Sequence, residues 1–115
     1  MGRLVGARVT ESIQSVKAEF FKAMAHPARI RVLELLCHGE LTVGELTDEL
    51  GLEGSHVSQQ LGVLRRANLV GIRKEGTTVI YSLADRRIAK VLQLAKEILL
   101  SYLTETAGLL SESGT

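Results

Sequence analysis

The first half of the chain shows apolar residues at helical spacing, which predicts helices separated by short polar breaks. Thr10 can cap a first helix whose apolar residues begin at Ile13. A second helix is expected to open at Pro27 and to stop at Gly39, because proline suits a first turn and glycine a C-terminus. Apolar positions cover most of its circumference, which is typical of a central, buried helix.

Two shorter helices follow, joined by a tight turn that contains glycine. Thr42 and Glu45 have the capping-box spacing, which predicts a helix from there to about Gly51. Ser55 can cap a fourth helix that runs to about Ala67. Two short helices with such a connection indicate a helix-turn-helix.

The period of the pattern then changes. Residues 69–74 and 78–83 are β-rich runs on either side of Glu75-Gly76-Thr77, which predicts a hairpin. Asp85 can cap a long final helix. The predicted fold class is mainly α with a small β-hairpin wing, a winged helix-turn-helix with the order helix, helix, helix, helix, hairpin, helix.

The composition fits one small globular domain, because apolar residues make up 45% of the 115 residues. Aromatic residues make up only 3%, so the core must consist of aliphatic side chains, a mix that suits helices. We expect a flexible N-terminal arm over residues 1–9, the folded domain over 10–106 and a flexible tail over 107–115.

Membrane insertion and secretion are not indicated. No apolar run approaches the roughly 18 residues that a spanning helix needs, and the N-terminus lacks the apolar stretch of a secretion signal. The single Cys37 excludes an internal disulfide and suits a reducing compartment. We therefore expect a cytoplasmic protein with no membrane partner.

Charge is unevenly distributed along the chain, although the formal net charge is only +1. Residues 65–87 contain six basic residues and two acids, whereas residues 40–53 contain five acids and no base. We expect one end of the domain to attract phosphate while another repels it.

The predicted fourth helix has an apolar side and a polar side. Val57, Leu61 and Leu64 form the apolar stripe, which we expect to be buried. The opposite face carries hydroxyls, an amide and a guanidinium that suit hydrogen bonding to base edges, and a glycine that permits close approach. An ordinary solvated helix face could have the same composition. This face holds Ser55, Gln59, Gly62 and Arg66, flanked by His56 and Ser58.

The predicted hairpin presents cations and hydroxyls together near its tip. Such a tip can reach phosphates or an adjacent minor groove, although charges can also simply protect an exposed strand edge. A helix-turn-helix followed directly by a basic hairpin favours DNA binding. The expected DNA-contacting residues are Ser55, His56, Ser58, Gln59, Arg65, Arg66, Arg73, Lys74 and Thr77.

The first and last helices are too apolar for a monomer of this size, unless both stripes are consumed internally. A two-fold pairing through these helices would bury the surplus and duplicate the DNA-reading elements. The expected dimer interface comprises Ile13, Val16, Phe20, Val91, Ala95, Ile98, Leu99 and Tyr102.

Four stretches resemble the ArsR family of winged helix-turn-helix repressors. Residues 26–36 are similar to the family's HPxRlxILxlL opening, and residues 40–46 (ELTVGEL), 55–64 (SHVSQQLGVL) and 69–83 (LVGIRKEGTTVIYSL) to its helix-turn-helix and wing. The resemblance implies a homodimer, joined through its first and last helices, that represses promoters until an effector releases it. It aligns Ser55, His56, Ser58 and Gln59 with base-reading positions. Many members have His where this chain has Gln59 and Gln60, so the operator sequence does not carry over.

The family's metal sites are not matched. Thr42 and Gly44 occupy the two cysteine positions of the thiolate sensors' ELCVCDL, and neither can replace a thiolate. Asp85 matches the first ligand of the zinc sensors' Asp-x-His pair, but Arg87 replaces the histidine. We expect Cys37 to be a small buried hydrophobe. We predict no metal or cofactor and leave the effector unknown; the remaining candidate ligands are His26, Cys37, His38 and His56.

We interpret the chain as a DNA-binding transcriptional repressor that binds a pseudo-palindromic operator as a homodimer, through a recognition helix at 55–67 and a wing at 73–78. The alternative is a winged-helix dimer that acts as a protein-interaction module without binding DNA. An enzyme is not expected, because the sequence shows no Ser–His–Asp or Cys–His pairing at plausible spacing, no paired carboxylates and no phosphate loop.

Overall fold

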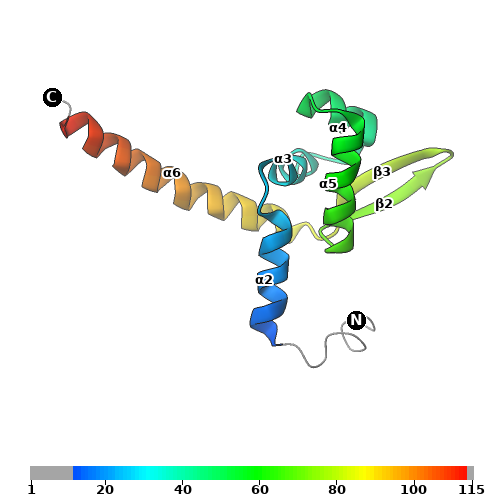
Figure 1. Cartoon of the computed structure of the whole chain (residues 1–115), viewed down its shortest axis with the longest axis horizontal. Helices are drawn as coiled ribbons and strands as arrows, with labels where there is room; N and C mark the ends of the chain where they lie inside the picture. Colours follow the sequence, from blue (N-terminus) through cyan, green and yellow to red (C-terminus); the bar gives the residue numbers. More distant parts are fainter. Residues whose placement is uncertain (1–11, 114–115) are drawn as a thin grey trace.

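The computed structural model describes residues 12–113, with side chains described through residue 108. Within this range the predicted order of four helices, a hairpin and a final helix is confirmed, and a short additional strand precedes the third helix. In Figure 1 the hairpin projects from one side of the helical body and the last helix from the other. The elements are α2 (Ile13–Met24), α3 (Pro27–Leu36), β1 (Leu41–Thr42), α4 (Val43–Leu50), α5 (Gly54–Arg66), β2 (Val70–Glu75), β3 (Thr78–Leu83) and α6 (Arg87–Ser113).

α3 is the central helix of the core, as its apolar pattern predicted. It packs against α2, α4, α5, α6 and β3. Val32 and Leu33 of α3, Leu46 of α4 and Leu61 of α5 are each at most 1% exposed. Burial is confined to one side of α3, however, because Ile30 is 36% exposed. The core thus holds the helix-turn-helix pair, α4 and α5, in a fixed arrangement on α3.

Two helices have N-terminal caps that differ from the predicted ones. The Ser12 hydroxyl caps α2 by accepting a hydrogen bond from the Ser15 amide at 3.1 Å, whereas Thr10, the predicted cap, lies outside the described residues. The predicted cap at Ser55 is wrong. Helix α5 begins one residue earlier, because the Glu53 carbonyl already accepts from the Val57 amide at 3.1 Å, and this places Ser55 in the first turn.

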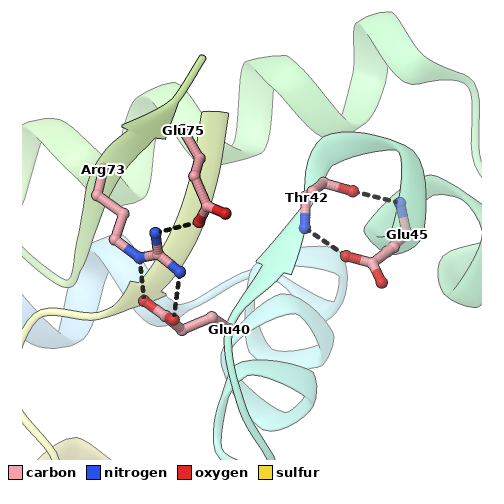
Figure 2. A network of polar contacts seen from close by, with 5 residues as sticks. All are labelled: Glu40, Thr42, Glu45, Arg73 and Glu75. Atoms are coloured by element: carbon pink, nitrogen blue, oxygen red, sulfur yellow. Dashed lines mark hydrogen bonds and ion pairs between the residues drawn. The ribbon is translucent and has the colours of Figure 1, made fainter. Parts of the chain in front are cut away.

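Other helix boundaries follow the local sequence. The predicted capping box of α4 is present: the Thr42 hydroxyl accepts from the Glu45 amide, and the Glu45 carboxylate accepts from the Thr42 amide (Figure 2). The α4 helix ends at Gly51 with a left-handed φ of 66°. α3 begins at Pro27 as predicted and ends at Leu36, before the predicted stop at Gly39.

The connection from α5 to the wing is a Schellman motif centred on Asn68, whose φ is 60°. The Leu69 amide donates to the Leu64 carbonyl at 2.9 Å and the Asn68 amide to the Arg65 carbonyl at 3.0 Å. Leu64 and Leu69 are both fully buried. This turn directs the chain from α5 straight into β2 and thereby fixes the wing relative to α5.

The wing is a three-stranded antiparallel sheet in the order β1-β3-β2. β2 and β3 pair from Val70↔Leu83 to Glu75↔Thr78, which confirms the predicted hairpin. Gly76 opens the two-residue turn with a φ of 65°, the positive value that such hairpin turns favour. The two-residue β1 pairs with β3 through Leu41↔Tyr81 and was not predicted.

α6 starts as predicted, because the Asp85 carboxylate accepts a hydrogen bond from the Arg87 amide at 2.8 Å. The helix continues to Ser113, so the predicted domain boundary at residue 106 falls inside it. Beyond Leu92 its described apolar side chains are exposed, and Figure 1 shows it extending away from the body. No helix of the described part of the chain combines the length and apolar character needed to cross a membrane.

Candidate nucleic-acid interface

Helix α5 presents a polar face to solvent because its apolar stripe is anchored in the core. Val57, Leu61 and Leu64 are at most 1% exposed, which confirms the predicted stripe. On the other side Ser55, Ser58, Gln59, Arg65 and Arg66 are exposed, while His56 and Gly62 are partly buried. The face opposite the core therefore offers hydroxyl, amide and guanidinium groups, which can hydrogen-bond with base edges and phosphates.

Arg66 folds back along α5 over Gly62. A Cβ atom placed on Gly62 would lie 3.3 Å from Nη1 of Arg66, so the guanidinium occupies the space that a side chain at position 62 would fill. In this structure the Arg66 guanidinium therefore covers the backbone at Gly62, where a close backbone approach was expected. The glycine allows one guanidinium to lie flat against the helix surface at the centre of the polar face.

His56 begins the polar face beside the turn between α2 and α3. Its ring lies 6.4 Å from that of His26, centroid to centroid, at an interplanar angle of 88°. His26 caps α3, because its Nδ1 accepts from the Ala28 amide at 3.1 Å. The His26 ring is therefore fixed, and it borders the start of α5.

The charge of Arg73 in the wing is compensated within the protein. Its guanidinium pairs with the carboxylate of Glu40 at 3.1 Å and with that of Glu75 at 2.5 Å (Figure 2). The hydrogen bond from Arg73 lowers the pKa of Glu40, and the two carboxylates raise the pKa of Arg73. Glu40 precedes β1 and lies 33 positions before Arg73, so this contact joins the wing to the start of the helix-turn-helix. Sequence reasoning placed Arg73 among the DNA contacts and missed Glu40.

The remaining cations of the basic segment are differently placed. Arg87 pairs with Asp85, which lowers the pKa of that carboxyl to about 2. No ion pair within residues 12–113 involves Arg65, Arg66 or Lys74, and all three are exposed. Their positive charge faces solvent at the end of α5 and near the wing tip. Two of the six cations in residues 65–87, Arg73 and Arg87, are therefore compensated by carboxylates, and the other four, Arg86 included, take part in none of the ion pairs of the described residues.

Exposed apolar side chains lie along α6 and α2, away from the polar face of α5. Among the predicted interface residues Ile13, Ile98, Leu99 and Tyr102 are 58–65% exposed. Val91 and Ala95 are also exposed, whereas Val16 and Phe20 are partly buried. The structure adds four exposed residues that the predicted set did not include: Phe21, Leu94, Leu100 and Leu103. Exposed apolar side chains along two helices are typical of an interaction surface.

Cys37, which was expected to be buried, is only partly buried. Together with His38 it lines an open groove of about 820 Å³ between α3 and α6. Burial and the nearby Glu34 carboxylate raise the pKa of its thiol. A raised pKa lowers the fraction of the nucleophilic thiolate at neutral pH. Within the described residues no group of three or more His, Cys, Asp or Glu side chains is arranged to hold a metal ion.

Comparison with known proteins gives consistent matches. The family described as "Bacterial regulatory protein, arsR family" matches residues 26–71. An uncharacterized HTH-type transcriptional regulator of Mycobacterium tuberculosis, Rv0081, is 48% identical over 104 residues, which are 90% of this chain and 91% of that protein. Its crystal structure aligns with a TM-score of 0.77 at 50% identity and covers 84% of this chain and 98% of that one.

Two further relatives have more specific names. The biofilm growth-associated repressor of Agrobacterium fabrum is 41% identical over 76 residues, 66% of this chain and 65% of that protein. A homodimeric winged helix-turn-helix DNA-binding domain of Mycobacterium bovis, solved by NMR, aligns with a TM-score of 0.77 at 26% identity. That alignment covers 86% of this chain and 92% of the other.

Proposed function

The chain belongs to the arsR family of bacterial regulatory proteins, and we propose that it is a repressor that binds a pseudo-palindromic operator as a homodimer. One observation carries the proposal: α5 is fixed on the core by three buried side chains, and every exposed side chain of its outward face is polar. Regulators of this architecture place such a helix in the major groove.

The polar face divides by the kind of contact that each group can make. We assign base reading to Ser55, Ser58 and Gln59, which have short hydrogen-bonding groups near the start of α5. His56 borders these three positions and is assigned to the same edge of the groove. Arg65 and Arg66, at the end of α5, are assigned to phosphates or to a guanine edge.

The wing contributes backbone contacts in this proposal. Lys74 and Thr77 are exposed at the tip, where an ammonium and a hydroxyl suit phosphate oxygens. Arg73 is assigned a different task from the one first expected, because Glu40 and Glu75 occupy its guanidinium. We propose that Arg73 braces the wing against the start of the helix-turn-helix and leaves the phosphate contact to Lys74.

Dimerisation is assigned to the exposed apolar surface of α6 and α2, with Ile13, Val16, Phe20, Val91, Ala95, Ile98, Leu99 and Tyr102 at its centre. Burial of these side chains against a second copy would remove them from water and present two α5 helices on one side. The M. bovis neighbour of the same fold is described as homodimeric, which supports this arrangement. We propose that the protein acts in the cytoplasm by binding alone, without catalysis.

Selection from a pool of randomised duplexes tests the proposal. The purified protein is expected to enrich an inverted repeat, and sedimentation of the complex should give two protomers per duplex. Enrichment of no sequence, together with binding of random duplex that does not weaken as salt rises, would refute DNA recognition and favour a protein-interaction module.

A further inference from the structure

Gln60 is a buried polar residue on the core side of α5, and contact with DNA does not explain it. It is 6% exposed and is the one polar side chain among the buried residues of the described range. Around the helix it borders the apolar stripe, one turn from Val57 and from Leu64, both fully buried. A buried amide is unfavourable unless it is hydrogen-bonded, so the identity of its partner matters.

Arg29 of α3 is that partner, and it bridges three helices. Its Nη1 donates to Oε1 of Gln60 at 3.0 Å, and its Nε donates to the backbone carbonyl of Ala23 at 2.6 Å. Ala23 lies in the last turn of α2, where carbonyls lack donors within the helix and attract positive charge. A single planar guanidinium therefore links the recognition helix to the end of α2.

We propose that Arg29 is a positioning residue for DNA recognition, which fixes the rotation of α5 about its own axis relative to α2. Apolar packing is non-directional, whereas two hydrogen bonds from one rigid fork specify an orientation. Short side chains such as Ser55 and Gln59 reach base edges only at one rotation of the helix. Because α2 belongs to the proposed dimer surface, the same bridge relates each recognition helix to the dimer axis.

This inference rests on the proposed function, and three variants test it. Gln60→Met keeps the side-chain length and removes the bridge, Arg29→Met keeps an unbranched stem and removes the guanidinium, and Arg29→Lys keeps the charge but not the fork. Arg31→Met is the matched control, because Arg31 is exposed on the same helix. For each variant we would measure affinity for the selected duplex and for a random duplex of equal length, well below the thermal midpoint.

The expected result is a loss of preference for the selected duplex over random DNA. Gln60→Met and Arg29→Met should lower the ratio of selected to random affinity about tenfold, comparable to losing one base contact, with random affinity retained. Arg29→Lys should fall between these variants and the unmodified chain, and Arg31→Met should leave the ratio unchanged. Should Arg29→Met fail to fold, Gln60→Met decides alone.

Two outcomes would overturn the inference: an unchanged ratio in Gln60→Met, or an equal loss in Arg31→Met. A purely structural role would lower the melting temperature without moving the ratio. The duplex preference of the unmodified chain distinguishes failure of this inference from failure of the proposed function. If it shows no preference for any duplex, DNA recognition itself is refuted, whereas a preference that survives Gln60→Met refutes only the role of Arg29.

Discussion

Replacement of Lys74 by alanine should reduce the salt dependence of DNA binding, whereas replacement of Arg73 should reduce it much less. Lys74 is exposed near the wing tip, and no ion pair of the described residues involves it. Arg73 already has two carboxylate partners, Glu40 and Glu75. Only a cation that neutralises a phosphate releases counterions from the DNA.

The magnitude follows from the number of contacts. Each phosphate contact adds about 0.9 to the slope of log affinity against log salt, so loss of Lys74 from both protomers should lower the slope by about 1.8. Between 50 and 200 mM salt this difference changes the ratio of unmodified to variant affinity by about 12-fold. Fluorescence anisotropy of a labelled duplex across a salt series measures both slopes.

The control is Lys96→Ala, which removes one exposed cation from α6, away from the wing. It should leave the slope unchanged. Equal decreases in slope for Arg73→Ala and Lys74→Ala would refute the reasoning, because compensation by Glu40 and Glu75 would then have no consequence for binding. An unchanged slope in Lys74→Ala would remove the wing from the proposed interface.

Three further predictions concern the base-reading face, the dimer surface and the start of α6. Gln59→Ala should cost about 1–3 kcal/mol of discrimination at one base step with random-duplex affinity unchanged, as competition titrations would show; a uniform loss would contradict base reading. Leu99→Glu should place a charge in the dimer contact and yield monomers in sedimentation; a dimer of undiminished affinity would move the interface elsewhere. The pKa of Asp85 is lowered from 3.8 to about 2, chiefly by hydrogen bonds from Arg87, so its stabilising contribution is present above about pH 4 and is lost as pH falls toward 2. The melting temperature of Asp85→Asn should therefore fall less between these pH values than that of the unmodified chain. An equal fall in both proteins would contradict a stabilising role of the Asp85 carboxylate.

Features set by neighbouring residues could be predicted from the sequence. The capping box at Thr42 and Glu45, the turn at Gly76 and the cap at Asp85 each depend on residues within a few positions. The outward face of α5 followed from periodicity alone, because three apolar positions define the side that must be buried.

Features set by distant residues could not be predicted in this way. The pairing of Arg73 with Glu40 spans 33 positions and depends on β1, a strand of two residues with too little pattern to detect. Gln60 did carry a signal, because a polar residue that borders a buried apolar stripe needs a partner if it is buried as well. Its partner Arg29 lies 31 positions away, and only the packing of α3 against α5 brings the two together.

The central claim is that two copies, joined through α2 and α6, place two α5 helices in one duplex. Hydroxyl-radical footprinting on the selected duplex tests it most directly. We expect two protected stretches on one side of the DNA, related by two-fold symmetry and centred about one helical turn apart, roughly 34 Å. A single protected stretch at saturation, or protection without symmetry, would contradict it.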